Sequence, residues 1–106
     1  MEEKYEIHTT RAVEKDLDKL QEDHFEIVKD EILSLESNPL KGVPLKGKLK
    51  DCRSIKFTLP GKGDYRVVYI LKEPSKVCLV FFIGPRENIY KEAARKVEVL
   101  RKQGLI

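Results

Sequence analysis

Residues 52–90 read CRSIKFTLPGKGDYRVVYILKEPSKVCLVFFIGPRENIY, and this stretch predicts a three-stranded meander. Residues 55–59 alternate apolar and polar side chains, which is the two-residue period of a strand with one buried and one open face. Residues 65–71 predict a second strand and residues 77–83 a third. The third segment is apolar on both faces, as is typical of a strand covered on both sides, so we expect it at the centre of the sheet.

Two short segments are predicted to reverse the chain between these strands. Residues 60–64 read Pro-Gly-Lys-Gly-Asp, and residues 73–75 read Glu-Pro-Ser. Proline fixes φ, glycine permits positive φ, and aspartate or serine hydrogen-bonds the local backbone, so both segments suit turns. Alternation in the second strand then places Tyr65 and Tyr69 on the face opposite to Arg66.

The residues before the meander predict a short strand followed by a helical hairpin. Residues 4–8 alternate as a strand does, and apolar residues then recur at helical spacing. The first helix is predicted to bury Val13, Leu17 and Leu20, and the second to bury Phe25, Val28, Ile32 and Leu35. Asp23 and Glu26 have the spacing of a capping box that would start the second helix, and Asn38-Pro39 would end it.

A third helix is predicted after the meander. Its apolar face would contain Tyr90, Ala93, Ala94, Val97 and Leu100. The predicted fold class is therefore α+β, in which an N-terminal strand and a helical hairpin pack on a mainly antiparallel sheet and a C-terminal helix closes the fold. The 106 residues suit a single domain, 1–106. No apolar run approaches the roughly 20 residues of a membrane span, so we expect a cytoplasmic protein without a membrane partner.

Charge is distributed unevenly along the chain. Residues 1–38 carry five basic and twelve acidic side chains, whereas residues 39–66 carry eight basic and two acidic ones. The predicted helical half is thus acidic and the predicted sheet half is basic. This segregation indicates that the sheet half faces a polyanion.

The sequence contains no familiar catalytic, phosphate-loop or zinc-binding pattern, so we expect no metal and no cofactor. Cys52 and Cys78 are far apart in the sequence, and we expect two reduced thiols, although a single disulfide stays open. His8 and His24 lie in different predicted elements, and we interpret them as surface or structural residues.

Cations on the open side of the predicted sheet are the remaining candidates for chemistry. Lys56 and Arg66 point away from the core faces of their strands, while Arg86 and Tyr90 follow the third strand. An RNA strand needs its phosphates neutralised and its bases stacked on flat groups, and such residues supply both. The alternatives are that Lys56 is merely solvated, that Arg66 pairs with Asp64 or a helix carboxylate, and that Tyr90 is an ordinary core residue.

A basic loop, residues 40–50, runs into the first strand of the meander. Its lysines either keep a connector soluble or bind RNA. We predict an RNA-binding role because these lysines lead directly into the strand that carries further cations. The candidate RNA-binding residues are Lys46, Lys48, Lys50 and Arg53.

The order of these segments resembles the RelE/ParE superfamily of bacterial and archaeal toxins. The resemblance covers nearly the whole chain, and its most specific parts are residues 51–57, 63–69 and 84–90. It implies the toxin of a type II toxin–antitoxin pair, with a cognate antitoxin as partner. RelE-like members cut mRNA in the ribosomal A site through attack of the 2′-hydroxyl on the adjacent phosphate, which also implies mRNA and the ribosome as partners.

The resemblance also assigns roles to four residues. Lys56 would be the general base or would position the hydroxyl, and Arg66 would stabilise transition-state charge. Arg86 would bind the scissile phosphate or assist the leaving group, and Tyr90 would stack on the substrate nucleotide. Better-studied relatives often carry a second basic residue where Ser54 stands in this chain.

Two other functions remain open from the sequence. A ParE-like toxin inhibits DNA gyrase without cutting RNA, and a degenerate family member would only bind its antitoxin. The combination of Lys56, Arg66, Arg86 and Tyr90 favours an endoribonuclease.

Overall fold

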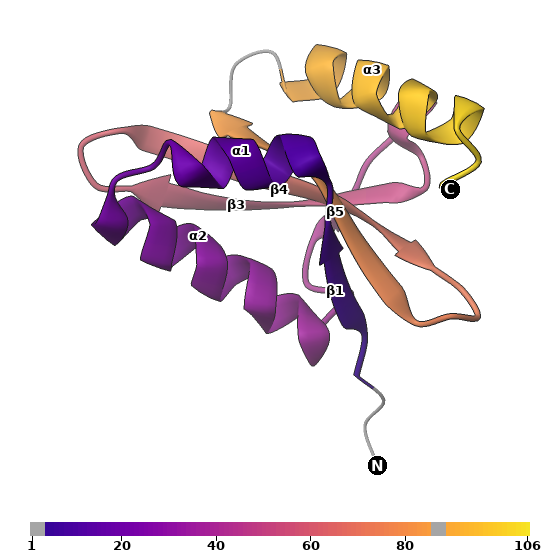
Figure 1. Ribbon diagram of the computed structural model, residues 1–106, viewed down its shortest axis with the longest axis horizontal. Coiled ribbons are helices and arrows are strands. Elements are labelled where there is room, and N and C mark those ends of the chain that lie inside the picture. Colours follow the sequence, from indigo (N-terminus) through magenta and orange to yellow (C-terminus); the bar gives the residue numbers. More distant parts are fainter. Residues whose placement is uncertain (1–3, 86–88) are drawn as a thin grey trace.

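The computed structural model of the chain describes residues 4–85 and 89–106 (Figure 1). Helices and strands follow one another in the predicted α+β order, which is confirmed. The strands are β1 (Glu6–Thr9), β2 (Val43–Pro44), β3 (Cys52–Leu59), β4 (Gly63–Lys72) and β5 (Val77–Pro85). The α-helices are α1 (Arg11–Asp18), α2 (Glu22–Leu33) and α3 (Ile89–Lys102), and the short 3-10 helices are η1 (Ser34–Glu36) and η2 (Gly47–Leu49).

The predicted meander is confirmed as the antiparallel strands β3, β4 and β5. The β3–β4 turn is closed by a hydrogen bond from the Lys62 amide to the Leu59 carbonyl, 2.9 Å long. Gly61 and Gly63 have positive φ values of 78° and 92°, a backbone region that side chains disfavour. The glycines of the predicted turn segment are therefore required by its geometry.

Within the described residues, one sheet has the strand order β1-β5-β4-β3-β2, and β1 runs parallel to β5. The central strand is β4, so the expectation that residues 77–83 occupy the centre is wrong. An apolar run indicates that both faces of a strand are buried, and any interior strand of a covered sheet can be buried on both faces. Here β5 lies between β1 and β4 and is interior without being central.

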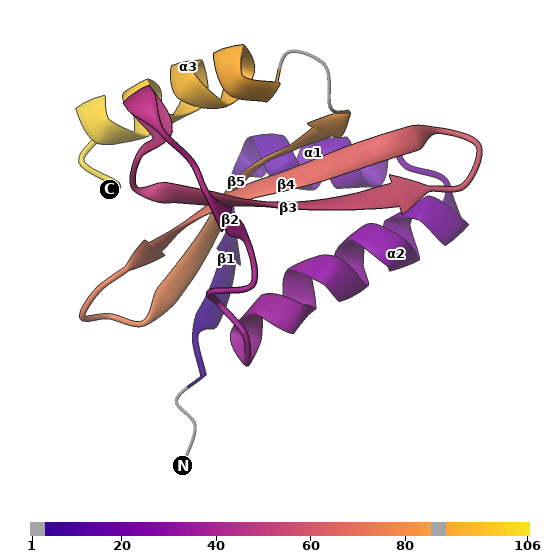
Figure 2. The ribbon, with the colours of Figure 1, turned by 180° about the vertical axis from the view of Figure 1, so that it is seen from behind.

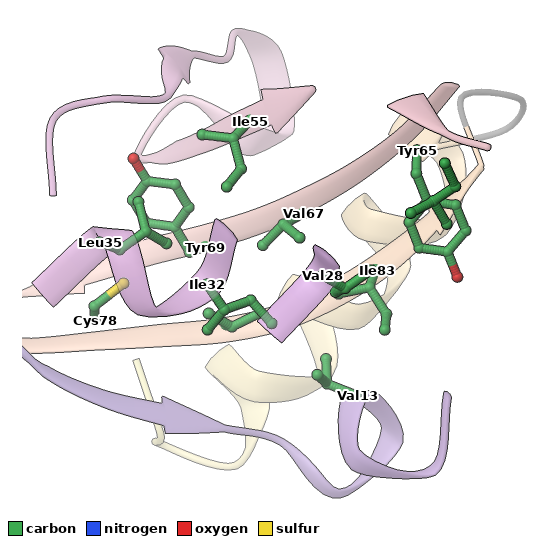
Figure 3. Packing of buried hydrophobic residues seen from close by; sticks show 12 residues of the cluster. Val13, Val28, Ile32, Leu35, Ile55, Tyr65, Val67, Tyr69, Cys78 and Ile83 are labelled. Carbon is green, nitrogen blue, oxygen red and sulfur yellow. The ribbon is translucent and has the colours of Figure 1, made fainter. Parts of the chain in front are cut away.

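The two faces of the sheet are covered by different helices (Figures 1 and 2). On one face, α1 and α2 bury a cluster that includes Val13, Val28 and Ile32 against Ile55 and Val67 (Figure 3). On the other face, α3 buries residues of β4 and β5. This second cluster includes Val68, Ile70, Phe81, Phe82, Ala93, Val97 and Leu100. The sheet faces predicted from alternation in β4 are confirmed.

The helix starts follow local chemistry, with one correction. Thr10 caps α1, because its hydroxyl accepts a hydrogen bond from the Val13 amide at 3.3 Å. The predicted capping box of the second helix is wrong, since α2 begins at Glu22 and its N-cap Gln21 makes no side-chain capping bond. Asp23 instead accepts a hydrogen bond from the neighbouring His24 amide, 3.0 Å.

His24 is a structural residue, as predicted. It is 4% exposed, and its Nε2 lies 2.7 Å from the Pro60 carbonyl oxygen in the β3–β4 turn. His24 thus occupies the buried stripe of α2 where Phe25 was expected, while Phe25 is only half-buried. No helix among the described residues has the length and apolar character needed to cross a membrane.

Cys52 and Cys78 are free and buried, which confirms two unpaired thiols. Burial raises the pKa of the Cys52 thiol to about 11 and that of Cys78 to about 12. At about pH 8 the reactive thiolate is therefore a very small fraction of either side chain.

We expect iodoacetamide to leave the native protein unmodified over an hour and to alkylate both thiols in guanidinium chloride. Mass spectrometry reads the result, and rapid labelling of the native protein would contradict it.

Candidate functional site

Lys56 and Arg66 lie directly opposite each other on β3 and β4. Paired residues in an antiparallel ladder project on the same face with Cβ atoms about 5 Å apart. The Lys56 side chain is exposed and the Arg66 side chain is half-buried. Like charges at such positions repel each other, and no ion pair within residues 4–85 and 89–106 compensates either one. This cation pair therefore favours an anionic ligand.

The cation pair lies in a groove with a volume of about 790 Å³ on the α3 side of the sheet. We call it the basic groove. Its lining residues are Val43, Pro44, Leu45, Lys46, Gly47, Ser54, Lys56, Arg66 and Tyr90. Among the residues that the structure describes, the lining contains no acidic side chain, so the basic groove has the charge and concave shape that suit a polyanion.

Tyr90 lies in the first turn of α3 and contributes to the other side of the basic groove. Its side chain is 56% exposed, whereas Ile89 and Ala93 beside it are 3% and 0% exposed. The interpretation of Tyr90 as an ordinary core residue is therefore wrong. An exposed phenol ring at the rim of a cationic groove offers a stacking surface for a base.

The segment before η2 forms one wall of the basic groove and is fixed from the opposite face of the sheet. The Tyr69 hydroxyl donates to the Pro39 carbonyl at 2.6 Å and accepts from the Gly42 amide at 2.9 Å. The Arg53 guanidinium donates to the Gly42 carbonyl at 2.7 Å. These bonds hold the chain where β2 pairs with β3, and so position Lys46 at the groove.

Gly42 is needed at this contact. A Cβ atom there would lie 2.7 Å from the Tyr69 hydroxyl oxygen and 3.1 Å from the Ser54 carbonyl oxygen. Both distances are shorter than van der Waals contact. The same approach places the Gly42 amide within hydrogen-bonding reach of Tyr69.

Two buried polar atoms of the basic groove have no hydrogen-bond partner among the described residues. They are Ser54 Oγ and Arg66 Nε. The alternative that Arg66 pairs with Asp64 or a helix carboxylate is wrong for the described residues, in which no ion pair reaches Arg66. The Asp64 carboxylate accepts from the Thr58 hydroxyl at 3.4 Å. Buried polar groups in proteins normally have a hydrogen-bond partner, so these two atoms are available to a group bound in the groove.

The remaining predicted residues lie in different places. Lys48 forms an ion pair with Glu98 of α3, 3.3 Å between Nζ and Oε1, and lines an adjoining hollow that also contains Lys46 and Tyr90. Lys50 is exposed and does not line the basic groove. Arg53 holds the groove wall by its hydrogen bonds to backbone carbonyls, as described above.

Arg86, predicted to bind the scissile phosphate, lies outside the described residues. Sequence reasoning also missed Ser54 as a groove residue. The signal was present, because Ser54 precedes Lys56 by two residues and strand alternation places both on one face. Within the described part of the chain, no group of three or more His, Cys, Asp or Glu side chains is placed to hold a metal ion.

The sequence model of the family described as "ParE-like toxin of type II bacterial toxin-antitoxin system" matches residues 7–94. The chain belongs to this toxin family. The match spans β1 through the first half of α3 and therefore includes every wall of the basic groove. A search of curated protein sequences found no match.

Solved structures of RelE toxins share the fold, which places this ParE-like toxin in the RelE/ParE superfamily. A mutant of the E. coli toxin RelE in the free state superposes with a TM-score of 0.71 at 24% identity, covering 92% of this chain and 98% of that one. The same E. coli mutant in complex with a peptide of the antitoxin RelB gives 0.64 at 27% identity, covering 84% and 93%. The Mycobacterium tuberculosis toxin–antitoxin complex RelBE2 gives 0.65 at 24% identity, covering 78% and 99%.

Proposed function

We propose that this toxin is an endoribonuclease that cleaves mRNA in the ribosomal A site. The observation that supports the proposal best is the convergence of Lys56, Arg66 and the exposed ring of Tyr90 in one groove. Cations neutralise phosphates, and the ring provides a platform for a base. A message on the ribosome would make the cytoplasm the site of action.

The proposed chemistry is a transesterification within the RNA. The 2′-oxygen forms a bond to the adjacent phosphorus as its proton leaves, and the bond from phosphorus to the 5′-oxygen breaks. The products are a 2′,3′-cyclic phosphate and a 5′-hydroxyl, which takes up a proton. The developing negative charge on the phosphorane is the feature that fixed cations stabilise.

Each groove residue has a proposed role in this reaction. Lys56 takes the proton from the 2′-hydroxyl or positions that hydroxyl, and Arg66 stabilises the charge on the phosphorane. Tyr90 stacks on or orients the nucleotide. Arg86 is proposed to bind the scissile phosphate or assist the leaving oxygen.

Further cations are proposed to hold the RNA backbone outside the reaction centre. Lys46 lines the basic groove, and Lys48 lines the hollow beside it. Lys50 and Arg53 were predicted to act with them. Their positions give them less support, because neither lines the groove and Arg53 is engaged with backbone carbonyls.

We also propose a cognate antitoxin that blocks the basic groove. Several solved relatives are complexes with an antitoxin, including those from E. coli and Mycobacterium tuberculosis. Acidic residues of such a partner would face Lys56 and Arg66 and relieve their mutual repulsion. The antitoxin would thereby compete with RNA for the same cations.

The proposal is tested by mapping message ends in reactions of the purified toxin with translating ribosomes. Cuts within translated codons, ending in cyclic phosphates, are the expected result. The Lys15→Ala variant serves as a control and should give the same cuts as the wild type. Lys15 is an exposed lysine of α1, on the other side of the sheet from the basic groove. Intact messages together with inhibited DNA gyrase would replace the proposal with the ParE-like function.

A further inference from the structure

We infer that Ser54 and Arg66 form a phosphate-binding subsite at the floor of the basic groove, in which the serine hydroxyl and Arg66 Nε donate to one phosphate group of bound RNA. The inference rests on the proposed function and adds a neutral donor to it. Ser54 is 3% exposed, yet its Oγ has no hydrogen-bond partner in the described residues. Arg66 Nε is likewise buried and unpaired.

The ladder places these two donors near each other. Ser54 pairs with Val68 on β4 and with Val43 on β2, so it lies in the middle of three strands. Arg66 is two residues from Val68 and thus occupies the position diagonal to Ser54, with Cα atoms about 7–8 Å apart. An arginine side chain spans such a distance, and both residues line the same groove.

The free-energy cost of a buried, unpaired hydroxyl favours a ligand that accepts a hydrogen bond from Ser54. A buried hydroxyl without a partner destabilises the free protein, so alanine would be the more stable residue there. Ser54 lines the basic groove, and its hydroxyl can rotate between staggered χ1 positions. Lys56, two residues along β3, adds charge on the same face. A phosphate group can accept from Ser54, Arg66 and Lys56 together, whereas a hydroxyl or amide ligand would leave the charges of the two cations uncompensated.

The test measures binding without cleavage. The probe is a fluorescent 2′-O-methyl RNA oligonucleotide, which lacks the attacking hydroxyl, and anisotropy gives its dissociation constant. Ser54→Ala is expected to weaken binding by about 10-fold, as for loss of one hydrogen bond to a charged group. Thr58→Ala is the matched control, because Thr58 is exposed on the same strand and does not line the basic groove. We expect its affinity to equal that of the wild type.

Two further readouts separate a phosphate donor from a structural serine. Serine carries no charge, so Ser54→Ala should leave the slope of log affinity against log salt unchanged, whereas Lys46→Ala should reduce its magnitude by about 0.7. The thermal midpoint of Ser54→Ala should equal or exceed that of the wild type. A lower midpoint with unchanged RNA affinity would overturn the inference, because it would mean that the hydroxyl is satisfied within the free protein, for example by water.

Oligonucleotides with one methylphosphonate linkage at a time locate the subsite. When the methylphosphonate stands at the linkage that Ser54 contacts, the wild type and Ser54→Ala should bind that oligonucleotide with equal affinity. The reason is that this linkage has lost its anionic oxygen. Equal affinity of the two proteins for the unmodified oligonucleotide would overturn the inference alone. Failure of the wild type to bind would overturn the proposed function and the subsite together. Weaker binding of Ser54→Ala to a poly-glutamate peptide but not to RNA would instead assign the subsite to carboxylates, and would also overturn the inference.

Discussion

Replacing Arg66 with alanine is expected to abolish growth arrest on expression and to lower message cleavage by about 10²–10³-fold, the usual effect of removing one fixed donor to a charged transition state. Arg66 lies opposite Lys56 in the basic groove and has no ion-pair partner among the described residues. Its guanidinium is therefore available to a phosphate. The rate of cyclic-phosphate formation on translating ribosomes gives the measurement.

Stability provides the control for this variant. Because Arg66 and Lys56 repel each other across the strands, Arg66→Ala should leave the thermal midpoint unchanged or raise it. Arg66→Lys should keep the charge but recover only part of the rate, since an ammonium cannot reproduce the planar fork of a guanidinium. Unchanged cleavage by a folded Arg66→Ala variant would remove Arg66 from the mechanism.

Replacing Tyr69 with phenylalanine is expected to lower the free energy of unfolding by about 1–3 kcal/mol and to weaken RNA binding. The ring stays in the core, but the Gly42 amide and the Pro39 carbonyl lose their shared partner. Gly42 is buried, so its amide has little access to replacement water. Urea unfolding followed by circular dichroism measures the first effect, and anisotropy with the 2′-O-methyl oligonucleotide measures the second.

Tyr65→Phe is the matched control for this substitution. Tyr65 is also a buried tyrosine of β4, at 7% exposure, but its hydroxyl forms no hydrogen bond within the described part of the chain. Its loss should change the free energy of unfolding by a few tenths of a kcal/mol. Equal effects of the two substitutions would show that the hydrogen bonds between Tyr69 and the groove wall contribute nothing to stability.

Strand alternation accounts for most of what the sequence predicted correctly. The period of two in residues 55–59 and 65–71 was sufficient to separate the face under α1 and α2 from the face that carries the cations. It thereby brought Lys56 and Arg66 to one surface before any register was known. Helical spacing similarly predicted the burial of Val13 and Val28.

The errors arose where distant segments meet. Strand order depends on which neighbours pair, so the composition of residues 77–83 did not reveal that β4 is central. Arg53 looked like one more free cation because its partners, the carbonyls of Leu40 and Gly42, belong to a loop that returns to the sheet. The burial of Ser54 likewise depends on β2 pairing alongside it.

The hydrogen bonds between Tyr69 and the groove wall have a consequence for genetic screens of this toxin. In a selection for cells that survive its expression, changes at Tyr69 and Gly42 should be recovered together with changes at Arg66. Tyr69 belongs to the cluster under α1 and α2, on the far side of the sheet from the groove. A map of detoxifying substitutions would therefore be broader than the footprint of the nucleic acid, and survivors would include positions that never meet a nucleotide.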